Sequence, residues 1–295
     1  MRYQHLPLYA ALLFSLSCTG LRSAPVTNMT ESNFHQRGTV ASADGTQIVY
    51  ETHGRGPFTL LLIHGWTCDR SYWRKQIEPL SADFQVITVD LAGHGESSAA
   101  RTQWTMAAFG EDVAAVANKL DARNVVIVGH SMGGPVMLEA ARRMPQRVRA
   151  LVGVDTLKNP DEAITPEQAD ELWGAFAGNF SAAVEGFVRR QFFLPQSDPA
   201  IVNQIATDMA AAPPALSIAA GKNLSVYDRR AALEAVAHLP LTLINAPIPP
   251  TQPDKYHSVH DNMTLIVMDQ AGHFPMQEVP NLFNKILKNT VLKTP

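Results

Sequence analysis

The sequence predicts a single α/β domain: a mostly parallel eight-stranded sheet flanked by helices, with a helical cap insertion. Two observations carry this prediction. Between residues 38 and 155, apolar β-branched runs alternate with helical stretches, which is the pattern of strand–helix–strand units. From 156 to 227 the pattern is helical without a strand signal, so a block of helices interrupts the core.

Eight segments have the composition of strands. They are 39–42, 47–52, 59–63, 85–90, 124–128, 149–154, 241–245 and 263–268. Asp44-Gly45 joins the first two and favours a tight hairpin turn, so we expect this pair to be antiparallel. The next four are continuously apolar, which is typical of strands buried on both faces.

Aromatic residues recur inside the insertion at steps of three and four, which places them on one face of a helix or helix pair. The set is Trp173, Phe176, Phe180, Val184 and Phe187. Such a face packs against the core or covers an apolar substrate pocket, and the pattern leaves both interpretations open.

The N-terminus has the features of an export signal. Residues 1–18 begin with a positive charge and continue with an apolar run shorter than the roughly 20 residues of a membrane span, as in a signal peptide. Cys18 resembles the lipid-bearing Cys of bacterial lipoproteins, although Ser15 replaces the usual Leu. A membrane tether through Cys18 and ordinary cleavage both remain open, and either predicts a periplasmic, secreted or lipid-anchored protein.

The remaining boundaries follow from composition. A polar linker is expected over 19–37, the core over 38–155 and 228–295, and the cap over 156–227.

The net charge of −3, without clustered Lys or Arg, argues against a nucleic-acid partner. We expect no cofactor and no metal ion, and the sequence does not determine the oligomeric state.

The strongest chemical signal is Gly129-His-Ser-Met-Gly133, between an apolar strand and a helical stretch. A sharp strand-to-helix turn exposes the serine hydroxyl, and the flanking glycines let the backbone pass without a side-chain clash. Ser131 is therefore the candidate nucleophile. A serine hydroxyl needs a positioned imidazole to take its proton, and His273, in the loop after the last strand, is the candidate base.

Four motifs in this order resemble the α/β-hydrolase superfamily, in its serine esterase and lipase branch. They are His64-Gly-Trp66, Asp90-Leu-Ala-Gly-His-Gly-Glu-Ser97, Gly129-His-Ser-Met-Gly133 and Ala271-Gly-His-Phe-Pro275, followed by Glu278 and Pro280. The resemblance covers roughly residues 38 to 293. It implies an oxyanion hole formed by the backbone N–H groups of Trp66 and Met132.

The acid that should orient His273 departs from the family pattern. Most members carry a carboxylate after the strand that corresponds to 241–245, but here Ala-Pro-Ile-Pro-Pro follows. Two candidates remain, Asp155 at the end of the strand before the insertion and Asp254 in the proline-rich loop. We favour Asp155, because some lipases of this fold carry their acid at that strand end.

These residues predict hydrolysis of a carboxylic ester or related acyl bond through an acyl-enzyme on Ser131, with a small-molecule substrate. A carbon–carbon bond hydrolase or a haloperoxidase-like enzyme would use the same three residues. A ligand-binding or sensing homologue without turnover is the other alternative, since fold alone does not give function. Neither substrate identity nor acyl chain length follows from the sequence.

Overall fold

The computed structural model describes residues 34–294. The eight strands are β1 (His35–Ala41), β2 (Gln47–His53), β3 (Thr59–Ile63), β4 (Gln85–Val89), β5 (Val125–His130), β6 (Val148–Val154), β7 (Leu241–Asn245) and β8 (Met263–Val267). They form one sheet in the order β1-β2-β4-β3-β5-β6-β7-β8. The β1–β2 and β2–β4 pairs are antiparallel and all others are parallel, which confirms the predicted fold class.

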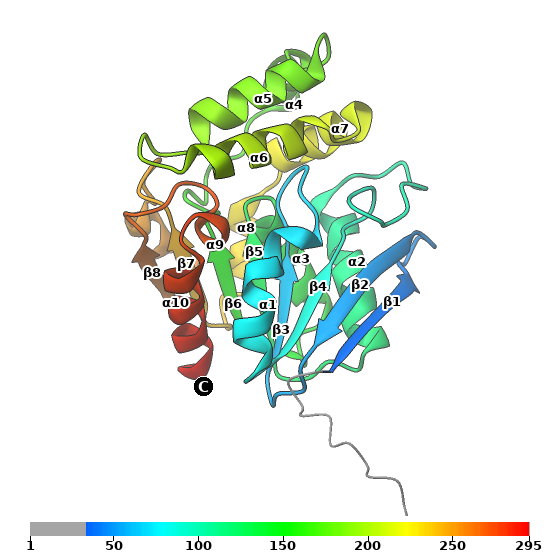
Figure 1. The fold of residues 1–295 in the computed structure, drawn as a ribbon, viewed down its shortest axis with the longest axis vertical. Helices are drawn as coiled ribbons and strands as arrows, with labels where there is room; N and C mark the ends of the chain where they lie inside the picture. Colours follow the sequence, from blue (N-terminus) through cyan, green and yellow to red (C-terminus); the bar gives the residue numbers. More distant parts are fainter. Residues whose placement is uncertain (1–33, 295) are drawn as a thin grey trace, which may run out of the picture.

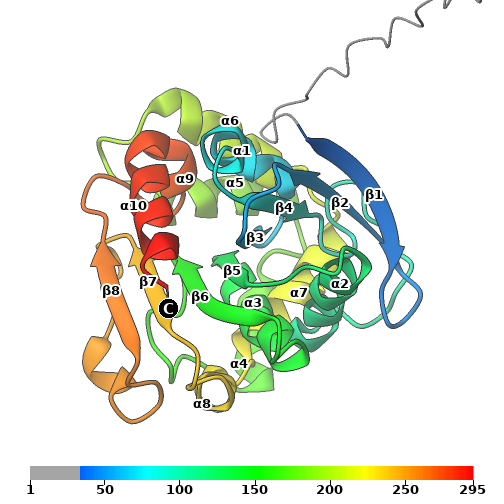
Figure 2. The same cartoon turned by 90° about the horizontal axis from the view of Figure 1, so that it is seen from below.

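Helices cover both faces of the sheet. The core helices are α1 (Arg74–Ser81), α2 (Met106–Lys119), α3 (Gly133–Arg143), α8 (Arg229–Ala235), α9 (Pro275–Glu278) and α10 (Pro280–Leu292), and the 3₁₀ helices are η2 (Arg70–Trp73) and η3 (Pro253–Tyr256). Seen from below, α1 and α10 lie on one face, and α2, α3 and α8 lie on the other (Figure 2). Strands β3 and β5 between them are fully buried, as their apolar sequences predict.

The insertion forms a cap over one end of the sheet (Figure 1). Its helices are α4 (Pro166–Gly174), α5 (Phe180–Gln191), α6 (Pro199–Ala210) and α7 (Pro214–Ser225). Side-chain caps explain several of its boundaries: Thr165, Asn179 and Asp198 each accept a hydrogen bond from a backbone N–H in the first turn of their helix.

The first strand begins earlier than predicted. Pairing starts at His35 opposite His53, so the last three residues of the predicted linker, 35–37, belong to the sheet. The sequence here lacks the alternation of polar and apolar residues that indicates a half-buried strand. The reason is that β1 is an edge strand whose residues are all exposed or half-exposed.

The predicted signal peptide, most of the linker and Cys18 lie outside the described residues. Among the helices of residues 34–294, none combines the length and the apolar character that a membrane crossing requires.

Candidate active site

Ser131 lies at the turn between β5 and α3 in a strained backbone conformation. Its φ is 53°, in the left-handed region that non-glycine residues rarely adopt. Two hydrogen bonds hold the turn: the Ser131 N–H donates to Val154 O at 3.0 Å, and Thr156 Oγ1 donates to Ser131 O at 2.7 Å. A Cβ on Gly129 would lie 2.2 Å from Gly133 O, so this turn needs glycine at 129.

His273 lies in the loop between β8 and α9, and both the cap and the core fix this loop. Its backbone N–H donates to Phe192 O at 2.7 Å, and its ring stacks on the Phe192 ring at a centroid distance of 4.1 Å. The carboxylate of Glu278 accepts hydrogen bonds from the Gly272 and Phe274 N–H groups, at 3.2 and 3.1 Å. The imidazole position is thus set by contacts on several sides.

Asp155 contacts His273 directly. Asp155 Oδ2 lies 2.5 Å from His273 Nδ1, and Asp155 Oδ1 accepts from the Ala246 N–H at 2.7 Å. Burial raises the pKa of Asp155, but the hydrogen bond from His273 and the positive charge of Lys158 outweigh it, so the net shift is downward. Asp254 is exposed on η3 and has no contact with His273 among the described residues.

Two side chains near Asp155 were not predicted from the sequence. Lys158 Nζ lies 2.8 Å from Asp155 Oδ1 and forms an ion pair with it. Asn245 is the last residue of β7, the strand after which most family members carry their acid. Its side chain accepts from the Thr156 N–H at 3.1 Å and donates to Thr156 O at 3.0 Å. The amide therefore holds the segment that carries Asp155.

The two N–H groups expected to form an oxyanion hole are free. In the chain from 34 to 294, neither the Trp66 N–H nor the Met132 N–H donates a hydrogen bond. His64 braces this loop: its Nε2 accepts from the Leu91 N–H at 3.0 Å, and burial lowers its pKa to about 4. A neutral imidazole is the form that can accept this bond.

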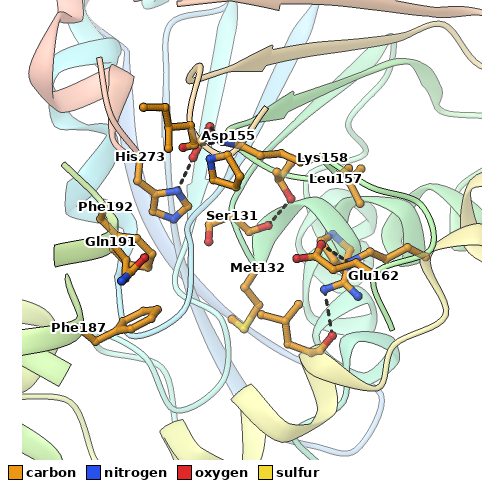
Figure 3. Close-up of a pocket in the computed structure, with 16 residues that line it drawn as sticks. Ser131, Met132, Asp155, Leu157, Lys158, Glu162, Phe187, Gln191, Phe192 and His273 are labelled. Carbon is orange, nitrogen blue, oxygen red and sulfur yellow. Dashed lines mark hydrogen bonds and ion pairs between the residues drawn. The ribbon is translucent and has the colours of Figure 1, made fainter. Parts of the chain in front are cut away.

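Ser131, Asp155 and His273 line one cavity of about 340 Å³ (Figure 3). Figure 3 shows the cap residues Phe187, Gln191 and Phe192 on one side and Lys158 and Glu162 on the other. Ser131 Oγ has no hydrogen bond to His273 in the described structure. Such bonds are often long without substrate and tighten when it binds.

The sequence profile of the α/β-hydrolase fold matches residues 59–217. The chain belongs to this family. A pimeloyl-[acyl-carrier protein] methyl ester esterase of Neisseria meningitidis serogroup B is 27% identical over 78% of this chain and 91% of the relative. A non-heme chloroperoxidase of Streptomyces lividans is 37% identical over 48% of this chain and 55% of the relative.

Among solved structures, a thermophilic esterase from Thermogutta terrifontis has a TM-score of 0.76 and 25% identity, covering 88% of this α/β-hydrolase and 98% of that chain. The first curated relatives are matched over only 28% to 55% of their length. The comparisons therefore establish the fold family of this chain, and they do not establish its activity.

Most of the aromatic face of the cap packs against the core of this α/β-hydrolase. Trp66 from the core meets Trp173, Phe176 and Phe180 edge to face, at ring distances of 5.1 to 6.4 Å. Trp66 Nε1 also donates to Ser217 O at 2.7 Å. Of the five predicted positions, Phe187 alone lines the cavity, so the packing interpretation holds for most of this face.

His130 is a further residue that sequence reasoning did not select. It is buried beside the nucleophile, and its Nε2 lies 2.8 Å from His273 O. Burial lowers its pKa to about 3, so the ring is neutral and Nε2–H donates to this carbonyl. His130 thus links the Ser131 turn to the His273 loop; its only sequence signal was its place in the serine motif.

Proposed function

We propose that this chain is a serine hydrolase that cleaves small, uncharged carboxylic esters through an acyl-enzyme on Ser131. The observation that carries the proposal is the contact between Asp155 and His273 Nδ1 beside a serine held at positive φ. A carboxylate at Nδ1 fixes the tautomer that leaves Nε2 free to accept a proton.

In the proposed reaction, Ser131 Oγ attacks the ester carbonyl carbon while His273 Nε2 takes the hydroxyl proton. The negative charge moves to the carbonyl oxygen, which accepts hydrogen bonds from the Trp66 and Met132 N–H groups. The intermediate then collapses, and the departing alkoxide takes the proton from His273. Water repeats the sequence on the acyl-enzyme, so that an acid and the free serine are released.

The cavity supports a small and uncharged substrate. Its volume of about 340 Å³ is near the lower end of ligand sites. Its charged lining residues are paired: Lys158 with Asp155 at 2.8 Å, and Arg229 with Glu162 at 3.5 Å. The fixed charges cancel, so no net charge favours an ionic substrate.

Labelling with a fluorophosphonate probe tests this proposal, because the probe reacts with activated serines. We expect wild type to be labelled and Ser131→Ala to be unlabelled, although its melting temperature should match wild type. Asp155→Asn should lower kcat on p-nitrophenyl butyrate by about 10⁴-fold, because the amide favours the wrong imidazole tautomer.

Asp254→Asn is the matched control, since it removes the other candidate carboxylate, and it should keep wild-type kcat. No labelling of folded wild type would instead support the binding-protein alternative. Loss of activity in Asp254→Asn with retention in Asp155→Asn would reverse the assignment of the acid.

A further inference from the structure

The paired ends of β1 and β2 bring together three side chains with metal-binding groups, at the end of the sheet away from the cap (Figure 1). His35 and His53 are directly opposite in the antiparallel register. Glu51 precedes His53 by two residues, so it projects from the same face of β2. The two imidazole rings stack, with centroids 4.4 Å apart.

One oxygen of Glu51 faces both imidazoles. Glu51 Oε2 lies 3.5 Å from His53 Nε2 and 3.9 Å from His35 Nε2, and one ligand atom from each of the three residues lies within 4.8 Å of the others. The second oxygen, Oε1, accepts from Arg70 Nε at 3.0 Å. Arg70 thereby orients the carboxylate and leaves Oε2 directed at the histidines.

His53 Nε2 is buried and lacks a hydrogen-bond partner within the described chain. A buried polar atom without a hydrogen bond is unfavourable, so a ligand that binds it would stabilise the fold. Metal binding requires the neutral imidazole, because its unprotonated nitrogen donates a lone pair to the ion.

We propose that His35, Glu51 and His53 bind one divalent transition-metal ion of the zinc class. Two imidazole nitrogens and one carboxylate oxygen are a ligand set that zinc uses, with water completing a tetrahedron. The lone pairs of stacked rings run parallel, so one ring must turn for both to reach the ion. The His35 side chain is 54% exposed and is free to do so.

The site would hold the edge strand β1 against β2. It lies at the opposite end of the sheet from Ser131, so we expect a structural effect and no part in ester cleavage. This differs from the expectation, based on the sequence, that the chain has no metal site: the three residues are separated by up to 18 positions and meet only through strand pairing.

Titration of the untagged, metal-free full chain with Co²⁺ and with Zn²⁺ tests the site. We expect one ion per chain, a visible Co²⁺ absorption band typical of low coordination number, and a higher melting temperature with Zn²⁺. His35→Gln and His53→Gln should each weaken binding more than about 10-fold, because each removes a ligand.

His257→Gln, at an exposed position on another loop, is the matched control and should bind as wild type does. His35→Gln carries the test, because an exposed side chain can change without loss of folding. Equal Zn²⁺ affinity in wild type and His35→Gln would overturn the proposal, as would a wild type that binds no Co²⁺. Esterase activity is measured in parallel, and its absence would not affect either outcome.

Discussion

At the residue scale, Lys158 is a fourth side chain beside the three proposed catalytic residues Ser131, His273 and Asp155. It pairs with the oxygen of Asp155 that does not face His273. Its ammonium group also donates to the carbonyl oxygens of Ala246 and Ile248, at 3.4 and 3.2 Å, and so ties the loop after β7 to the acid. The cation helps to keep Asp155 ionised in a buried position.

Lys158→Met should move the acid limb of the kcat/KM profile to higher pH. Folding lowers the pKa of Asp155, so the carboxylate is ionised above that pKa and protonates as the pH falls through it. Without Lys158, fewer charges oppose the effect of burial, which raises the pKa of Asp155. The Asp155 carboxylate then begins to protonate at a higher pH. The measurement is kcat/KM for a p-nitrophenyl ester from about pH 2 to about pH 7. This range includes the ordinary carboxyl pKa of 3.8, below which the pKa of Asp155 lies in the wild type.

Lys255→Met is the control for that profile. Lys255 pairs with Asp161 at 3.4 Å and has no contact with Asp155, so its removal should leave the acid limb in place. An unchanged limb in Lys158→Met would show that the ion pair does not affect the reacting groups.

At the element scale, the turn from β5 into α3 depends on backbone packing. Gly129 faces the Gly133 carbonyl, and a Cβ on Gly133 would lie 2.7 Å from Ile63 O at the end of β3. The serine motif therefore needs glycines so that the turn can pass close to its own helix and to the neighbouring strand. The hydrogen bonds of Ser131 to Val154 and Thr156 hold it in its strained conformation.

Gly129→Ala should abolish probe labelling of Ser131 and destabilise the fold by about 1–3 kcal/mol or more, because the new methyl group meets backbone atoms that cannot move aside. Chemical denaturation measures the free energy of unfolding. Gly174→Ala is the control: a Cβ there meets nothing within 4 Å, so stability and labelling should stay at the wild-type level or slightly above.

At the scale of the whole molecule, the cavity lies between two parts of the chain. The core supplies Ser131, Asp155 and His273, and the cap supplies Phe187 and Phe192. The size of the cavity is therefore set by how closely the cap packs on the core. The aromatic contacts around Trp66 hold that distance.

Phe187→Ala should shift the acyl preference toward longer chains. Removing the ring enlarges the cavity, and each added methylene that becomes buried contributes about 0.8 kcal/mol, or roughly 4-fold in kcat/KM. The measurement is the ratio of kcat/KM for p-nitrophenyl octanoate to that for the butyrate. Leu172→Ala, a half-exposed cap position away from the cavity, should leave the ratio unchanged.

The sequence predicted much of the fold because its signals are local. Continuous apolar runs identified the buried strands, and Asp44-Gly45 identified the hairpin. It missed the start of β1, where a polar edge strand has no alternation. Export through residues 1–18 and a tether at Cys18 stay predictions, since they lie outside the described residues.

By itself, the sequence determined the parallel sheet, the turn that carries Ser131 and the loop that carries His273, because each depends on residues adjacent in the chain. Only the tertiary structure decided between Asp155 and Asp254 as the partner of His273. It also showed that His130, Lys158 and Asn245 lie at the site. It showed further that most aromatic residues of the cap pack against the core and do not line the cavity. The physical reason is that these contacts join loops at the ends of different strands, and their separation is set by sheet order and cap packing.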